Sequence, residues 1–269
     1  MPAHVHGDGD APAPPAPRGQ GILWVGAPPA LPPGIAGVAA DVADVVEAVQ
    51  EESGDVLLLT RDAAARRAAR AARMALGPER IAVFHVEAPL TAWVLALHLM
   101  MPLAPTWPVA QLGGALQTLV QATRTRVALS SLASLEHPAP SFAQYVVSLS
   151  PWTTFDVDLS TGIISKATAA MPQSGGPVAV ARSAKPVRKD YADWMPGALQ
   201  LDPAGAGWKA RRWCEVTDLV VSDAQITAML SQLPAHRCPV CDRVGSSPSC
   251  LFCDHPLRPP VAEKFGVAV

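Results

Sequence analysis

Four cysteines near the C-terminus constrain the fold of this chain more than any other feature. Cys238, Cys241, Cys250 and Cys253 follow the spacing C-x2-C-x8-C-x2-C. Two residues between cysteines let one tight turn direct both sulfurs to a single point, and two such turns facing each other create a closed tetrahedral site. Residues 242–249 are mostly turn-forming and can reverse the chain between the pairs. The sequence therefore predicts one structural zinc ion bound by all four cysteines.

This segment resembles the short zinc-ribbon modules that are often appended to bacterial proteins. The resemblance covers residues 236–257 and rests on the two cysteine knuckles, with Leu257 where such modules often place an apolar residue. The family usually has glycine after each cysteine pair, whereas this chain has Asp242 and Asp254. No family is recognised for the rest of the chain.

Other uses of the cluster remain open. Iron of the rubredoxin type takes the same four ligands, a single CxxC pair can be redox-active, and His236 or His255 could replace one cysteine. Two pairs this close together favour coordination. A closed site of four cysteines has no open position, so its role is predicted to be structural. Cys214, beside Trp213, is interpreted as a small core residue.

Composition indicates a globular chain. Apolar residues make up 49% and charged residues 16% of the 269 residues, and the net charge of −2 favours no polyanionic partner. The first twenty residues lack the apolar core of a signal peptide, so we expect a cytoplasmic protein with a disordered arm over residues 1–20. Residues 88–123 contain no charged side chain, but prolines interrupt them and no membrane span is expected.

Apolar strands alternate with helical segments through the first half. The expected strands are 21–26, 55–60 and 81–86, with a fourth at 126–129; the expected helices are 35–49, 61–76, 89–101 and 109–122. Continuous apolar strands between helices are typical of parallel βα units. The predicted fold class is α/β, with a Rossmann-like parallel sheet and flanking helices over residues 21–148.

The pattern changes in the second half. Alternating residues 153–159 turn at Gly162 into a hairpin, residues 178–182 and 212–221 form further strands, and Ser222 caps a short helix. We therefore expect a small β-rich (α+β) region with a short helix over residues 149–234, followed by a zinc ribbon over residues 235–260.

No catalytic residues are predicted. The loop after the first strand is rich in proline and is not G-x-G-x-x-G, and no P-loop or G-x-S-x-G motif occurs. Gly113-Gly114 lies in an apolar helix and is predicted to be a close-packing site. The favoured hypothesis is a non-catalytic adaptor or assembly component whose zinc ribbon presents an interaction surface to a protein partner.

Two alternatives remain. A nucleic-acid-binding accessory protein could use the basic and aromatic segment 182–213, for which the candidate residues are Arg188, Lys189, Trp208, Lys209, Arg211 and Arg212. An enzyme of unrecognised type could place its site at the carboxyl ends of the parallel strands. Whether the protein is an enzyme is left open, with the balance against it.

Overall fold

The computed structural model describes most of the chain between residues 20 and 257. It describes all of these residues except 28, 30, 134, 151–152, 167–175, 186, 188–196 and 204–205. The predicted N-terminal arm, apart from Gln20, therefore lies outside the described residues.

The first half folds around a parallel sheet, as predicted, but one of its four strands is formed by residues 36–38, which were expected to be helical. Its order is β2-β1-β3-β4, with strands β1 (Gly21–Val25), β2 (Ala36–Val38), β3 (Val56–Thr60) and β4 (Ile81–His85). Every residue of β1 and β3 is buried, because helices cover both faces of this sheet. The predicted α/β class with a parallel sheet and flanking helices is confirmed.

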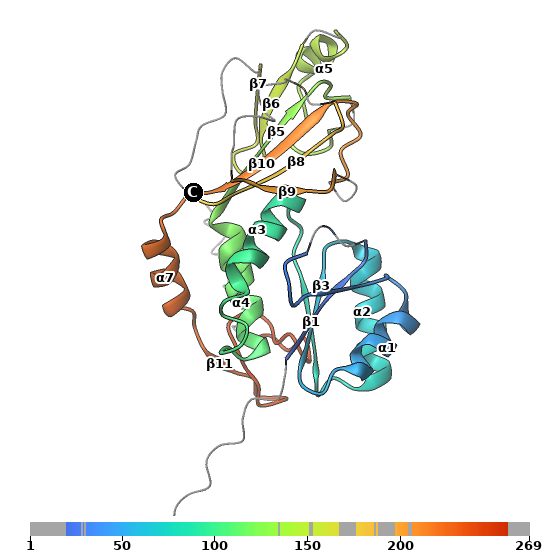
Figure 1. Cartoon of the computed structure of the whole chain (residues 1–269), viewed down its shortest axis with the longest axis vertical. Coiled ribbons are helices and arrows are strands. Elements are labelled where there is room, and N and C mark those ends of the chain that lie inside the picture. Colours follow the sequence, from blue (N-terminus) through green and yellow to red (C-terminus); the bar gives the residue numbers. More distant parts are fainter. Residues whose placement is uncertain are drawn as a thin grey trace, which may run out of the picture.

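Helices α1 (Val42–Glu51) and α2 (Ala63–Leu76) cover one face of the sheet (Figure 1). Each begins at an aspartate whose side chain accepts a hydrogen bond from a backbone N–H of the first turn: Asp41 from Ala43, and Asp62 from Ala65. Helix α2 ends at Gly77, whose φ of 93° suits a residue without a Cβ.

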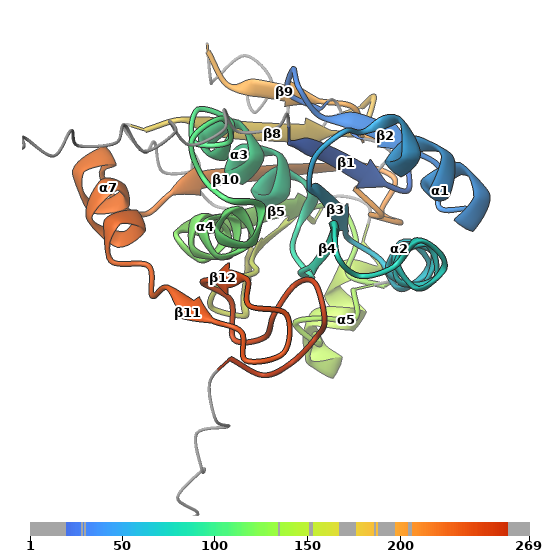
Figure 2. The same cartoon turned by 90° about the horizontal axis from the view of Figure 1, so that it is seen from below.

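Helices α3 (Leu90–Met100) and α4 (Val109–Gln121) cover the other face. Helix α3 is buried almost all round because it packs between this sheet and a second one (Figure 2). Trp93 of α3 meets Trp24 and Phe84 of the parallel sheet edge-to-face, with ring centroids 5.4 and 5.9 Å away. This double burial explains the uncharged stretch 88–123. Among the described residues, no helix has the length and apolarity needed to cross a membrane.

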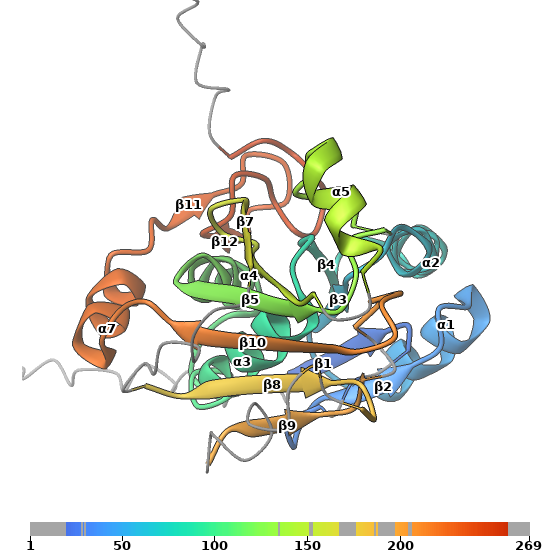
Figure 3. The ribbon, with the colours of Figure 1, turned by 90° about the horizontal axis from the view of Figure 1, so that it is seen from above.

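The second sheet has six strands, ordered β7-β6-β5-β10-β8-β9 (Figure 3). They are β5 (Thr123–Leu129), β6 (Phe155–Asp158), β7 (Ile163–Lys166), β8 (Val178–Arg182), β9 (Leu199–Leu201) and β10 (Trp213–Leu219). All neighbours are antiparallel except β8 and β9. The predicted hairpin is β6–β7.

The strand expected at residues 126–129 lies in this second sheet, where β5 pairs along all seven residues with β10. Periodicity identifies such a strand but not its partner, because the partner lies over eighty residues further along the chain. The domain boundaries drawn at residues 148 and 234 stay a prediction.

Two short helices and a small hairpin complete the described fold. Helix α5 (Phe142–Ser148) was not predicted, whereas α7 (Asp223–Ser231) begins at the predicted cap Ser222, which accepts a hydrogen bond from the backbone N–H of Gln225. Strands β11 (His236–Arg237) and β12 (Val244–Gly245) belong to the cysteine segment, residues 236–257.

Candidate metal centre

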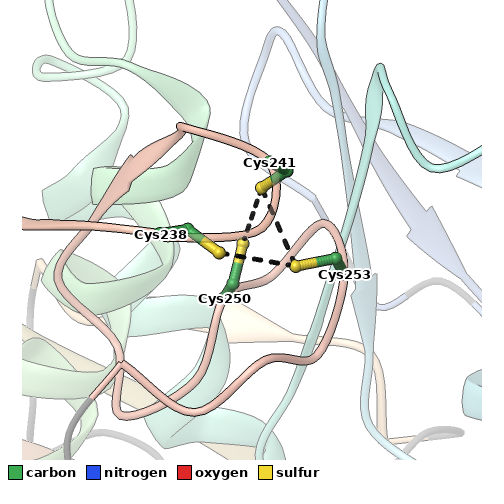
Figure 4. A group of neighbouring side chains, drawn as sticks. All are labelled: Cys238, Cys241, Cys250 and Cys253. Carbon is green, nitrogen blue, oxygen red and sulfur yellow. Dashed lines mark hydrogen bonds between the residues drawn. The ribbon is translucent and has the colours of Figure 1, made fainter.

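The four cysteine sulfurs converge on one point (Figure 4). Their Sγ atoms all lie within 4.8 Å of one another, with separations of 3.6 Å for Cys238–Cys253, 3.4 Å for Cys241–Cys250 and 3.7 Å for Cys241–Cys253. A tetrahedral metal ion with bonds of about 2.3 Å to sulfur separates its ligands by about 3.8 Å. The four cysteines could therefore hold a metal ion, while His236 and His255 are not part of the group.

The two knuckles repeat one backbone geometry. Asp242 N donates to Cys238 O at 2.9 Å, and Asp254 N donates to Cys250 O at 2.8 Å. Asp242 and Asp254 have φ values of 61° and 59°, in the left-handed region where glycine is usual and aspartate is among the tolerated residues. These aspartates replace the glycines typical of zinc ribbons without changing the turn.

Backbone donors and burial act on the thiols in opposite directions. Burial raises the pKa of Cys241, Cys250 and Cys253 above the ordinary value. Burial acts in the same way on Cys238, but the N–H groups of Cys241 and Val240 donate to its sulfur and lower its pKa overall. A divalent cation among the sulfurs would favour all four thiolates.

The cysteine segment is part of the protein's own core. Phe252 is 1% exposed and packs in the cluster shared by the parallel sheet, α3 and α4. Leu251 O accepts hydrogen bonds from Val83 N of β4 at 2.9 Å and from Arg73 Nη1 of α2 at 3.0 Å. The segment therefore hydrogen-bonds to β4 at the outer edge of the parallel sheet.

Charged groups strengthen this docking at two places. Arg243 forms an ion pair with Asp55, and its guanidinium lies 4.5 Å from the centroid of the Phe252 ring. Asp254 pairs with Arg73 and, at 3.5 Å, with Arg70. These pairs join the segment to residues more than 180 positions earlier in the chain.

The predicted close-packing role of Gly113 and Gly114 is confirmed. A Cβ on Gly113 would lie 2.3 Å from Leu251 Cδ1, and one on Gly114 would lie 2.4 Å from Ser246 Cβ. Both distances are shorter than any real contact, so α4 approaches the cysteine segment closely because it lacks side chains there.

The candidate nucleic-acid residues are only partly described. Arg188 and Lys189 lie outside the described residues, Lys209 and Arg211 are exposed, and Arg212 is half-buried. Trp208 is half-buried and its Nε1 donates to Glu215. Their role in binding nucleic acid stays a prediction.

A buried carboxylate that sequence analysis missed lies between the second sheet and α3. Glu215 of β10 is 1% exposed and accepts hydrogen bonds from Thr91 N at 2.8 Å and Thr91 Oγ1 at 2.6 Å, besides Trp208. Burial lowers the pKa of the nearby Arg61, and the charge of Glu215 acts against that shift. The sequence held one signal for this site, because Glu215 is an acidic residue among the largely apolar residues of β10.

A pocket of about 290 Å³ opens beside this carboxylate. Its lining residues are Leu129, Ser131, Leu135, Glu136, His137, Gly207, Trp208, Lys209 and Ala210. Leu129 belongs to the core between α3 and the second sheet, and Leu135, Trp208 and Ala210 pack against it. The pocket thus has an apolar floor, with His137 and Lys209 exposed beside it.

No family model matches the sequence, and no curated protein matches it either. Several solved structures match the fold. A DegV family protein from Eubacterium eligens, loaded with heptadecanoic acid, is 10% identical with a TM-score of 0.52, over 76% of this chain and 100% of that chain. The fatty acid kinase (Fak) B3 protein of Streptococcus pneumoniae, loaded with linoleic acid, is 10% identical over 75% of this chain and 99% of its own, with a TM-score of 0.48.

These findings correct the predicted function. The sequence predicted a non-catalytic adaptor whose zinc ribbon presents an interaction surface. The cysteine segment instead buries Leu251 and Phe252 within its own chain, and the similarity in fold is to a protein that carries a fatty acid. The adaptor prediction is therefore wrong, and nothing in these findings favours the nucleic-acid or enzyme alternatives.

Proposed function

We propose that this protein binds a long-chain fatty acid in the pocket beside Trp208. The proposal is supported by one observation above all: the pocket combines an apolar floor with a polar rim that includes Lys209, in a fold similar to that of a protein loaded with heptadecanoic acid. An apolar pocket with a few polar groups is the usual form of a small-molecule site.

The acyl chain would lie against Leu129, Leu135 and Ala210. These residues border the core between α3 and the second sheet, so a chain entering here loses contact with water along its length. Each buried CH₂ group contributes about 0.8 kcal/mol, or about fourfold in affinity.

The carboxylate of the fatty acid would stay at the pocket mouth. The buried donors Thr91 N, Thr91 Oγ1 and Trp208 Nε1 already bind the carboxylate of Glu215. A second carboxylate beside Glu215 would be repelled in this buried setting. Lys209 and His137 line the same pocket and are exposed. The Lys209 ammonium can pair with the head group and His137 can donate a hydrogen bond to it, and these groups act against the single negative charge of Glu136 in the same lining.

Binding is tested with delipidated full-length protein and saturated acids of increasing length, by isothermal titration. Affinity for heptadecanoic acid should exceed that for nonanoic acid by at least a hundredfold, because eight CH₂ groups are added. An affinity independent of chain length would contradict a buried acyl chain.

Two variants with controls locate the site. Leu135→Trp fills the pocket and should weaken binding at least tenfold, whereas Met229→Trp, on the distant helix α7, should not. Lys209→Ala should weaken binding a few-fold more than Arg211→Ala, an exposed position that does not line the pocket. Equal effects within either pair would place the ligand elsewhere.

We further propose that the metal of the four cysteines is zinc and that its role is structural. The sulfur separations are close to those of tetrahedral coordination, and four thiolates leave no open position. Protein purified under reducing conditions should contain one zinc per chain by elemental analysis, and Cys241→Ser should lose zinc and stability together. Iron in place of zinc, or full zinc content in the variant, would contradict the proposal.

A further inference from the structure

A second cleft, of about 330 Å³, is lined by residues of the cysteine segment, α2, β4 and α4. Its lining residues are Arg66, Arg70, Val83, Phe84, His85, Gln117, Ser247, Pro248, Ser249, Leu251 and Asp254. It shares no residue with the pocket beside Trp208.

Positive charge exceeds negative charge around this cleft. Asp254 is the acidic residue of the lining, and Arg70 and Arg73 both pair with it. Arg66 is exposed, and its guanidinium forms no ion pair or hydrogen bond with any residue that the structure describes. Glu87, which lies 3.9 Å from His85, is 92% exposed and does not line the cleft. The lining thus holds two guanidinium groups and one carboxylate, and Arg73, which lies outside the lining, shares that carboxylate.

An unsatisfied hydroxyl lines the same cleft. Ser247 is 3% exposed, and its Oγ has no hydrogen-bond partner among the described residues. A buried hydroxyl left without a partner destabilises the fold, because it has lost its hydrogen bonds to water. A ligand oxygen in the cleft would supply that partner.

The remaining polar groups extend the set of donors. Ser249 and Gln117 line the cleft, and His85 is fixed on its wall by a hydrogen bond from Nδ1 to Thr60 O at 3.0 Å. Donors therefore come from α2, β4, α4 and the cysteine segment, which surround the space on several sides.

We propose that this cleft binds a phosphate group, either as free phosphate or as the head of a small phosphate monoester. A phosphate carries about two negative charges and several strong acceptor oxygens, which match an unpaired arginine and hydroxyls arriving from different directions. Seven of the eleven lining residues are charged or polar, which suits an anion better than an acyl chain. The proposal does not depend on fatty-acid binding.

The test is an NMR titration of the full-length, metal-loaded protein with inorganic phosphate, at constant ionic strength. Saturable shifts should centre on the amides of Ser247 and Ser249. Glycerol phosphate forms a second arm: if it binds more tightly than phosphate, the ligand is a monoester, and if more weakly, it is the free anion. Absence of saturable shifts with both up to about 10 mM would overturn the proposal, since charge-assisted sites bind more tightly.

Two variants separate a built site from general attraction. Arg66→Ala should weaken phosphate binding about tenfold, whereas Arg67→Ala, the exposed neighbour that does not line the cleft, should leave it unchanged. Ser247→Ala should also weaken binding while leaving the urea midpoint unchanged or higher, because it removes an unsatisfied hydroxyl. Equal losses in the two arginine variants, or a Ser247→Ala variant with undiminished affinity, would overturn the proposal.

Discussion

Gly114→Ala is the sharpest test of how the cysteine segment docks. The new Cβ would lie 2.4 Å from Ser246 Cβ, and 3.2 and 3.3 Å from the carbonyl carbon and Cα of Ser246. Because these atoms belong to the backbone or are attached directly to it, no rotamer change can relieve the overlap. The segment must move away from α4 as a unit.

Two opposing terms give the magnitude. Alanine is favoured over glycine inside a helix by about 1 kcal/mol, which would stabilise α4. Overpacking a close-packed site costs about 1–3 kcal/mol, and the upper end applies here because backbone atoms must shift. We therefore expect Gly114→Ala to lower the free energy of unfolding by about 2 kcal/mol. Gly113→Ala should cost less, because its nearest contact is the Leu251 Cδ1 methyl, which can rotate.

The assay is urea unfolding of the metal-loaded protein, combined with the rate of metal transfer to a coloured chelator. Gln121→Ala, exposed on the same helix, is the control for alanine substitution itself. Gly114→Ala should lower the urea midpoint and accelerate metal transfer, and the control should do neither. If Gly114→Ala is as stable as the wild type or more so, the close approach seen here does not restrain the segment.

Three further predictions concern the buried groups. Chelation of the metal under reducing conditions should lower the free energy of unfolding, measured in urea, by several kcal/mol. An unchanged urea midpoint would show that the metal has no structural role. Glu215→Gln should cost about 2–4 kcal/mol, because the amide N–H₂ would replace one of the two oxygens and face either the donors of Thr91 or the donor of Trp208; a neutral effect in urea unfolding would show that the network relaxes. Burial raises the pKa of Cys214 to about 12 because the buried site favours the neutral thiol. This preference stabilises the fold fully below the ordinary pKa of 9.0, and the stabilisation is lost as the pH rises toward 12. It should not react with a thiol reagent at pH 8 until the protein unfolds, and reaction in the folded state would contradict this.

The parallel sheet and its helices could be predicted because their signals are local. Asp62 and Gly77 mark the ends of α2, and the buried strands read as short apolar runs between helices. The partner of β5 could not be predicted, since pairing with β10 depends on residues far along the chain. The convergence of the four cysteines was predicted from spacing alone, because each knuckle is one turn.

What the sequence could not supply is what the cysteine segment contacts. Arg73 is one of four arginines in the sequence of α2, yet it is 8% exposed and binds Leu251 O and Asp254. Helical periodicity places an arginine on a face of the helix but does not reveal a partner 178 residues away. The same limit hid both pockets, because each is formed by segments that are distant in sequence.

The contacts of the cysteine segment also indicate what a metal ion at the four cysteines would do for this fold. Strand β4 lies at the end of the parallel sheet, and an unpaired edge strand invites pairing with another chain. Leu251 O accepts from Val83 N and so occupies part of that edge, while Phe252 fills the core beneath it. Since the segment has only two-residue strands, the cysteine cluster must hold its shape. Loss of the metal should therefore uncover β4 and Phe252 together, so aggregation should accompany demetallation and depend on protein concentration; a metal-free chain that stays monomeric in light scattering would refute this link.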